Sequence, residues 1–180
     1  QVYVFFGDER FLPAGDPERN DKQAFDALLR HVDIPTLNVF RYPALAAGEQ
    51  ADGKALDAAA EFYGKTVDQV APDGFDIHLL GMGPEGHINS LFPHTDELLH
   101  AEGSVVAVRE CPKPPAERVS LTMRAVNRSR AVWLLVSGAE KKEAAGQVFD
   151  GGNGAEWPAA LASGTEATLL WVDNAANPLL

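Results

Sequence analysis

Short apolar runs alternate with longer amphipathic segments along most of this chain, and this alternation limits the possible folds more than any other feature. The apolar runs have the length of buried strands, and the segments between them show the 3.6-residue period of helices. Strands joined by crossover helices form a mostly parallel sheet with helices on both faces, so the sequence predicts an α/β fold. The predicted strands are 2–6, about 38–40, 75–80, 105–109, 118–122, about 131–137 and 167–172.

Two helices are predicted in the first half of the chain. Apolar side chains in residues 21–32 repeat at the helical period, and Asn20 and Gln23 have the spacing of the N-cap and N3 residues of a capping box. Residues 51 to about 70 place their apolar side chains along one side of a helix.

A third helix is predicted from about residue 139 to residue 149. Ser137 and Glu140 have the spacing of a second capping box, and Gly151-Gly152 is a typical helix end. The sequence has no internal repeat, low-complexity tract or evident linker. We therefore expect residues 1–180 to form a single α/β domain.

The chain begins inside an apolar run, Val2–Phe6, that is typical of a central strand. The first residues of most domains are polar and poorly ordered. We therefore expect that an N-terminal part of the fold precedes this sequence and is missing from it.

The charge balance argues against one class of partner. The chain has 15 Lys and Arg against 26 Asp and Glu, for a formal net charge of −11, whereas nucleic-acid-binding proteins present a clustered excess of basic side chains. A few local cations and backbone N–H groups can still hold one phosphate in an acidic protein. We therefore expect a small-molecule ligand and no nucleic acid.

The sequence also argues against a membrane protein. No run reaches the roughly 18 to 20 apolar residues that a membrane span needs, and the first residues lack the layout of a signal peptide. Cys111 is the only cysteine and cannot form an internal disulfide, which fits a reducing compartment. We expect a cytoplasmic protein, a monomer or a weak homo-oligomer, that does not bind membranes.

A glycine-rich segment follows the predicted strand 75–80 and carries the most informative candidate residue. Ligands of such sheets bind outside the carboxyl ends of the strands. Gly81, Gly83 and Gly86 allow close approach of the backbone to a ligand, and they lead to His87, whose imidazole can take a proton from water. The spacing of the glycines is not that of a dinucleotide site, and the alternative for His87 is an ordinary surface histidine.

Charged residues follow or begin other predicted strands. Asp8 and Arg10 follow the first strand and could face the same cleft as His87, where Arg10 would stabilise negative charge on a substrate oxygen. Lys141 lies in the first turn of its helix, where an anion would be favoured. Asp8 and Arg10 could instead form a solvated ion pair. Arg118 begins the predicted strand 118–122 and could be an ordinary charge on an edge strand. The remaining histidines are scattered and do not suggest a metal site.

Several blocks resemble the 6-phosphogluconolactonase family. The sequence FDIHLLGMGPEGHINSLFP is similar to that family's FDLxLLGMGxDGHxASLFP block, and FFGDERFLP is similar to F-F-x-D-E-R-x-V-P. Three further blocks are similar to R-[IV]-T-L-T, to N-x-A-x-x-V-x-x-x-x-x-G-x-x-K and, through Trp171, Asp173, Ala175 and Ala176 with one residue fewer between Trp and Asp, to W-x-x-D-x-A-A. The first two blocks lie at 75–93 and 5–13, and the three further blocks lie at 118–122, 127–141 and 171–176, in the order given.

The resemblance implies a Rossmann-like α/β sandwich and the hydrolysis of 6-phospho-D-glucono-1,5-lactone to 6-phosphogluconate, without cofactor or metal. It implies that His87 is the acid/base that activates water, with Glu85 orienting the imidazole. Arg10 would steady the oxyanion or bind the sugar, and Arg118 and Lys141 would hold the 6-phosphate.

Two departures from the family pattern concern the same site. The family usually has Asp at the position of Glu85, so this carboxylate reaches about one methylene further. The family's S-G-G-x-T-P loop, which binds the sugar phosphate through backbone N–H groups, does not occur in this sequence.

Two other functions stay open. One is glucosamine-6-phosphate deamination, in which the related histidine block reads D-G-H-I-A-F-N-E. Ile88 matches that block, but Phe92 stands where it has Glu, and Arg10 stands where that branch has Tyr. The other is a non-catalytic protein that binds sugar phosphates.

Overall fold

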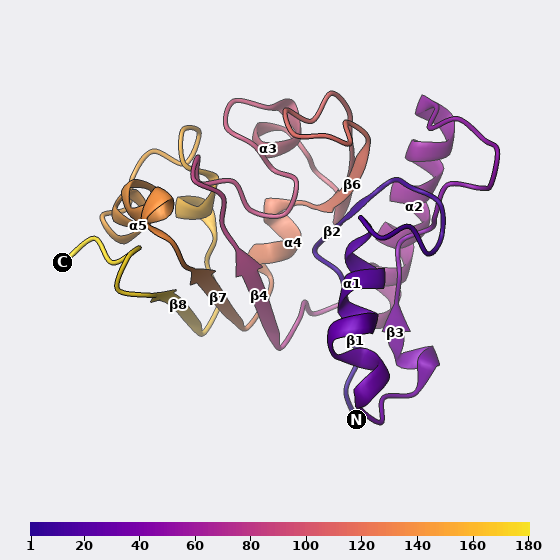
Figure 1. The fold of residues 1–180 in the computed structure, drawn as a ribbon, viewed down its shortest axis with the longest axis horizontal. Coiled ribbons are helices and arrows are strands. Elements are labelled where there is room, and N and C mark those ends of the chain that lie inside the picture. The colour runs from indigo at the N-terminus through magenta and orange to yellow at the C-terminus, as the bar shows by residue number, and fades with distance from the viewer.

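A parallel sheet of three strands lies at one end of the molecule (Figure 1), in a computed structural model that describes residues 1–180. Strand β7 is in the middle, and β4 and β8 pair with its two edges in the same direction. Strand β8 has the bounds that the sequence predicted. The three strands are β4 (Ile77–Gly81), β7 (Ala131–Val136) and β8 (Ala167–Val172).

A second parallel pair lies at the other end of the molecule. Strand β1 (Val4–Phe5) pairs with β3 (Val39–Phe40), and the connection between them contains helix α1. The predicted strand 2–6 is thus shortened to two residues, and Val2 and Tyr3 are half exposed or more.

The third sheet is antiparallel, in the order β2-β6-β5. No helix separates β5 from β6, because the intervening residues 109–117 include three prolines, so the chain returns antiparallel to itself. The α/β class is confirmed, but Asp8–Arg10, expected only to follow the first strand, forms a strand of its own. The strands are β2 (Asp8–Arg10), β5 (Val105–Val108) and β6 (Arg118–Leu121).

Helix α1 (Asn20–Ala27) is shorter than expected and continues as a 3-10 turn, η1 (Leu29–His31). The predicted capping box is wrong, since Arg19 is the N-cap and no side chain caps this helix. The Asn20 amide instead donates to the backbone oxygen and to Oδ1 of Asp8, both at 2.9 Å. A tertiary hydrogen bond has replaced the local one.

The capping box predicted at Ser137 is also wrong. A 3-10 turn, η3 (Ala139–Lys141), leads into helix α5 (Lys142–Phe149), and the N-cap of η3 is Gly138. The N–H of Gly138 donates to the carboxylate of Asp173, directly after β8, at 3.1 Å. The turn is therefore held by Asp173 and not by a cap at Ser137. The other helical segments are η2 (Thr36–Asn38), α2 (Gly53–Val70), α3 (Asp96–Leu99), α4 (Met123–Asn127) and η4 (Pro158–Leu161).

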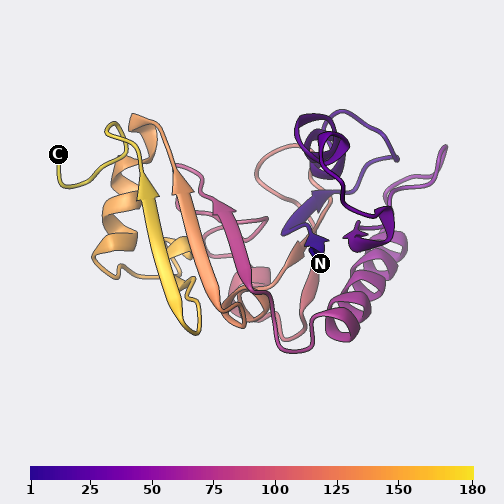
Figure 2. The same ribbon diagram turned by 90° about the horizontal axis from the view of Figure 1, so that it is seen from below.

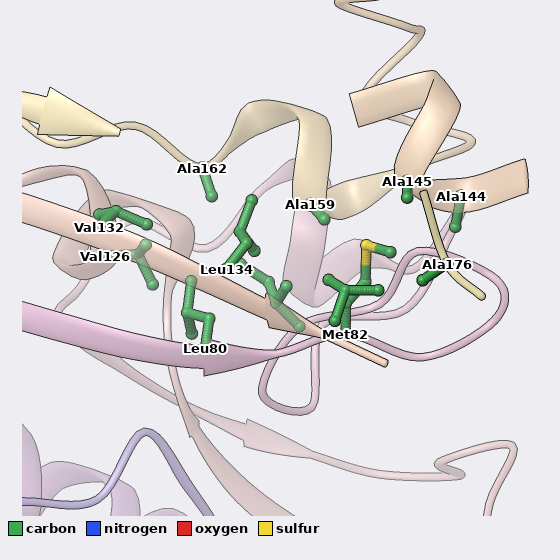
Figure 3. Packing of buried hydrophobic residues seen from close by; sticks show 12 residues of the cluster. Leu80, Met82, Val126, Val132, Leu134, Ala144, Ala145, Ala159, Ala162 and Ala176 are labelled. Carbon is green, nitrogen blue, oxygen red and sulfur yellow. The ribbon is translucent and has the colours of Figure 1, made fainter. Parts of the chain in front are cut away.

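One hydrophobic core fills the space between the parallel sheet, α5 and η4 (Figure 3). Leucine and valine side chains of the strands meet alanines, and these small side chains allow the helical segments to lie close to the sheet. The residues shown are Leu80, Met82, Ile88, Val126, Val132, Leu134, Val136, Ala144, Ala145, Ala159, Ala162 and Ala176.

A second core packs α2 against β1, β3 and the antiparallel sheet. Helix α2 lies at the opposite end of the molecule from α5 (Figure 2). The buried hydroxyl of Tyr63 accepts from the Phe6 N–H at 2.9 Å and donates to the Phe40 carbonyl at 3.1 Å. This helix therefore ties the ends of β1 and β3 together.

Only one face of the parallel sheet is packed within this chain. Leu80 is 1% exposed, whereas Leu79, which points to the other face, is 57% exposed. Other apolar side chains of the open face are also well exposed, namely Ile77, Leu135, Leu169 and Trp171.

None of the helices combines the length and the apolar composition that a membrane span requires.

Candidate active site

The turn between β4 and His87 is built around two glycines. The N–H of Gly83 donates to the His87 carbonyl, and the N–H of Gly86 donates to the Gly83 carbonyl, both at 3.0 Å. A Cβ on Gly83 would lie 2.1 Å from Nδ1 of His87, so the imidazole occupies the space of the missing side chain. Gly86 has a φ of 76° that L-residues rarely adopt. Gly81 has no atom within 4 Å of its ideal Cβ position, so space does not require glycine there.

The His87 imidazole lies between a carboxylate and an aromatic ring. Its Nδ1 is 3.3 Å from Oε1 of Glu85, and its ring stacks on Phe92 with 4.3 Å between centroids. Burial lowers the pKa of His87 below its usual value of 6.5; Glu85 and Asp8 oppose this shift, and Lys113 adds to it. The imidazole is therefore neutral near pH 7, which is the form that can accept a proton.

Glu85 is held by a cation that the sequence did not single out. The Lys113 ammonium lies 2.7 Å from Oε1 of Glu85 and 5.7 Å from the centre of the Phe92 ring. Burial opposes ionisation of Glu85, but the hydrogen bond from Lys113, together with contacts to its own backbone N–H and to His87, lowers its pKa. Glu85 is therefore an ionised partner for His87.

Asp8 and Arg118 meet at a buried serine. The pairing of β2 with β6 places Asp8 opposite Ser120 and Arg10 opposite Arg118. The Ser90 hydroxyl donates to Oδ2 of Asp8 at 2.6 Å and accepts from Nη1 of Arg118 at 3.5 Å. Nη1 of Arg118 is also 4.0 Å from the Asp8 carboxylate. The structure thus joins two predicted site residues through a third that was not predicted.

The rest of the Arg118 guanidinium holds the turn between β5 and β6. Its Nε donates to the Pro115 carbonyl at 3.1 Å, and its Nη2 donates to the Lys113 and Pro114 carbonyls at 3.0 and 3.2 Å. Arg118 is only 5% exposed. Nη1 is therefore the guanidinium nitrogen that donates to no backbone carbonyl.

Arg10 is anchored at one end of its guanidinium. Its Nη1 donates to the carbonyl of Glu18, and its Nε is buried without a hydrogen-bond partner. Neither Arg10 nor Lys141 has a hydrogen bond or ion pair with another predicted site residue. The structure therefore joins Asp8 with Arg118 and Glu85 with His87 through side-chain contacts, whereas Arg10 lies opposite Arg118 by strand pairing alone and Lys141 contacts none of them.

Glu9, between the two outward residues of β2, faces the interior. Its carboxylate accepts from the N–H groups of Arg10, Asn20 and Asp21 at 2.7 to 2.9 Å. Burial raises its pKa, while these hydrogen bonds and the nearby Arg19 act in the opposite direction. Glu9 thus fixes the start of α1 next to β2 and positions the strand that carries Asp8 and Arg10.

Lys141 ends η3, just beyond β7. The turn before it is held by Asp173, which also accepts from the Ala176 N–H at 2.8 Å. The segment Asp173–Ala176 therefore has a structural role in shaping the turn that carries Lys141.

Sequence reasoning missed Ser90, Lys113 and Asn20. Ser90 lies within the block that carries His87, so its place there was the available signal. Lys113 stands next to prolines in a turn, and nothing in the sequence indicates that its side chain reaches Glu85. No group of three or more His, Cys, Asp and Glu side chains is arranged to hold a metal ion.

Comparison with known families gives one match over most of the chain. Residues 1–171 match the profile of the family of glucosamine-6-phosphate isomerases/6-phosphogluconolactonase. The chain is 48% identical over 181 residues to a 6-phosphogluconolactonase of Mycobacterium leprae, covering 98% of this chain and 72% of that protein. It is 49% identical over 178 residues to the 6-phosphogluconolactonase of Mycobacterium tuberculosis, covering 96% and 71%.

Solved structures show the same relationship. The chain is similar to a 6-phosphogluconolactonase of Thermotoga maritima, with a TM-score of 0.81 and 28% identity over 95% of this chain and 72% of the other. It is also similar to a monomeric glucosamine-6-phosphate deaminase, with a TM-score of 0.74 and 25% identity over 94% and 70%.

Proposed function

The chain belongs to the glucosamine-6-phosphate isomerase/6-phosphogluconolactonase family, and we propose that it hydrolyses 6-phospho-D-glucono-1,5-lactone to 6-phospho-D-gluconate in the oxidative pentose phosphate pathway. The observation that carries this proposal is the His87 imidazole, kept neutral by its surroundings and paired at Nδ1 with Glu85. Relatives named 6-phosphogluconolactonase at 48 and 49% identity support it.

His87 acts as the general base through its Nε2 atom. Oε1 of Glu85 lies 3.3 Å from Nδ1, and although the two atoms are not aligned as a hydrogen bond, the carboxylate charge favours the tautomer that carries its proton on Nδ1. The lone pair of Nε2 is then free to accept a proton. His87 takes a proton from water as the water oxygen attacks the lactone carbonyl. When the tetrahedral intermediate collapses, the carbon bond to the ring oxygen breaks and the imidazolium returns the proton to that oxygen.

Arg10 and Asp8 assist in different ways. The Arg10 guanidinium is anchored through Nη1 on the Glu18 carbonyl, and its positive charge would stabilise an oxyanion formed from the lactone carbonyl. Asp8 is held by Ser90 and raises the pKa of His87, so its charge favours the imidazolium that forms during the attack.

The 6-phosphate is bound chiefly by Lys141. Its position at the start of α5 adds the favourable field of a helix N-terminus, and its ammonium has no protein partner. Arg118 contributes at most Nη1, because its other nitrogens already donate to the carbonyls of the β5–β6 turn. The glycines of the turn bring the backbone near the substrate, and Gly83 makes room for His87.

Phe92 favours the lactonase over the deaminase activity. In the deaminase branch a glutamate supports the histidine from the position that Phe92 occupies here. In this chain an aromatic ring stacks on the imidazole at that place, 4.3 Å away, and Glu85 is the carboxylate beside it. The site therefore lacks, at position 92, the glutamate that supports the histidine in the deaminase branch.

The expected cytoplasmic location is part of this proposal. Cys111 is a free and buried thiol, packed with Phe92 and Val108. A reducing compartment suits such a residue.

The test compares two substrates. The chain is incubated with freshly prepared 6-phosphogluconolactone, and 6-phosphogluconate formation is measured above the spontaneous rate. In parallel, ammonia release is measured from glucosamine-6-phosphate. We expect acceleration of the first reaction only. Ammonia release without lactone hydrolysis would assign the chain to deamination, and no turnover of either would support a binding protein.

A further inference from the structure

Lys113 lies in the proline-rich turn between β5 and β6, yet its main chain is firmly held. The buried Arg118 donates to the carbonyls of Lys113, Pro114 and Pro115 at 3.0 to 3.2 Å. Arg118 is itself anchored on β6, opposite β2. The Lys113 side chain is 43% exposed. Packing therefore does not fix its conformation, which depends on the held backbone and on the contacts of the ammonium group.

The Lys113 ammonium contacts both groups that flank the His87 ring. It lies 2.7 Å from Oε1 of Glu85, the same oxygen that is 3.3 Å from Nδ1 of His87. It also lies 5.7 Å from the centre of Phe92, whose ring stacks on the imidazole. One cation therefore bridges the carboxylate and the aromatic ring that determine the orientation of the imidazole.

We propose that Lys113 is a positioning residue for His87, which holds the Glu85 carboxylate and the Phe92 ring around the imidazole and keeps the imidazole in its proton-accepting form. This inference rests on the proposed function in so far as His87 is the base. Lys113 acts through Glu85 and needs no contact with the substrate.

The charges around His87 explain how Lys113 does this. Glu85 approaches from the same turn and Asp8 from β2, and both favour the imidazolium. Lys113 approaches from the β5–β6 turn and disfavours it, in the same direction as burial of the ring. Lys113 also shares Oε1 of Glu85, which limits the pull of that carboxylate on the proton. Loss of Lys113 should therefore raise the pKa of His87 and leave more of it protonated near neutral pH.

The test uses Lys113→Met, Lys113→Gln and Lys113→Arg in the full chain, with Lys54→Met as the control. Lys54 is an exposed lysine of α2 with no ion pair, so its loss makes the same change in net charge away from the site. The pKa of His87 is followed by NMR titration, its signal being assigned among the 5 histidines by its loss in His87→Ala. The pH profile of kcat/KM for the lactone is measured in parallel.

We expect the His87 pKa to rise in Lys113→Met and Lys113→Gln, and kcat/KM to fall several-fold near neutral pH and recover at higher pH. Lys113→Arg should restore the wild-type titration, and Lys54→Met should leave it unchanged. An unaltered or lower His87 pKa in both neutral variants would overturn the proposal. The NMR titration decides this even if the chain does not hydrolyse the lactone, so failure of the proposed function is detected separately.

Discussion

His87 owes its place to a glycine four residues before it in the chain. The imidazole fills the space that a side chain at position 83 would need, with Nδ1 only 2.1 Å from the ideal Cβ. The histidine and the turn are therefore one unit, in which the missing side chain is as important as the ring.

Gly83→Ala should displace the imidazole and reduce kcat/KM strongly, because an added Cβ cannot coexist with the present ring position. Misplacement of a catalytic group by about 1 Å can cost on the order of 100-fold in rate. The measurement is kcat/KM for the lactone, with thermal unfolding to confirm that the variant folds. Gly64→Ala in helix α2 is the control, since its Cβ would make only ordinary contacts, 3.7 Å or more from Val105, and it should retain wild-type turnover. Equal loss in both variants would show that the contact with His87 is not the cause.

At the scale of the elements, burial decided which parts of the sequence could be predicted. Strands β7 and β8 were found from their apolar runs because one face of each packs on the core. The helix ends were less predictable, since Asn20 bonds Asp8 and the turn at Gly138 is fixed by Asp173. Local spacing cannot show that a partner distant in sequence will compete for the same group.

Strand β4 offers a direct test of this one-sided packing. Leu80 is 1% exposed and belongs to the core, whereas Leu79 is 57% exposed. Leu80→Ala should lower the free energy of unfolding by about 2 to 5 kcal/mol, because it leaves a cavity. Leu79→Ala should cost less than about 1 kcal/mol. Chemical denaturation of the two variants checks this, and similar losses would contradict the direction assigned to these side chains.

The turn η3 carries Lys141, the residue that we propose binds the 6-phosphate of the substrate. Lys141→Ala should raise KM for the phosphorylated lactone about tenfold or more, the effect of losing one charge-assisted hydrogen bond. Hydrolysis of an unphosphorylated lactone should change little. Lys142→Ala, an exposed neighbour, is the control. Equal losses on both substrates would remove Lys141 from phosphate binding.

At the scale of the whole molecule, the α/β class followed from the alternation of apolar runs and helices, but the division into sheets did not. The antiparallel sheet arises because β5 and β6 are joined without a helix and β2 pairs with β6. The candidate site shows the same limit. His87 and Glu85 are neighbours in sequence and could be predicted together, whereas Lys113 reaches them from another sheet. The spacing of residues along the chain does not reveal contacts between segments that are distant in the sequence.

The pH dependence of global stability should reflect His78, a buried residue of β4. Burial lowers its pKa from 6.5 to about 4, and its Nδ1 has no hydrogen-bond partner. As pH falls from 6.5 toward 4, the unfolded chain takes up a proton at His78 that the folded chain excludes. The folded state should thereby lose up to about 3 kcal/mol.

His78→Phe should reduce the slope of unfolding free energy against pH in this window, because Phe does not titrate. Denaturation curves at several pH values between 4 and 6.5 measure the slope. His31→Phe, at an exposed histidine, should leave it unchanged. An unchanged slope in His78→Phe would show that His78 is not the source of acid sensitivity.

The most direct test of the proposed chemistry is the pH profile of kcat/KM for fresh 6-phosphogluconolactone, corrected for spontaneous hydrolysis, in the wild type and in His87→Ala. A general base contributes on the order of 100- to 10,000-fold. Since burial lowers the pKa of His87, wild-type activity should persist at pH 6.5 and decline only in more acidic solution. In His87→Ala, kcat/KM should be lower by about that factor and should no longer decline in acidic solution. A folded His87→Ala protein with near-wild-type turnover and an unchanged pH profile would contradict the assignment of His87 as the base.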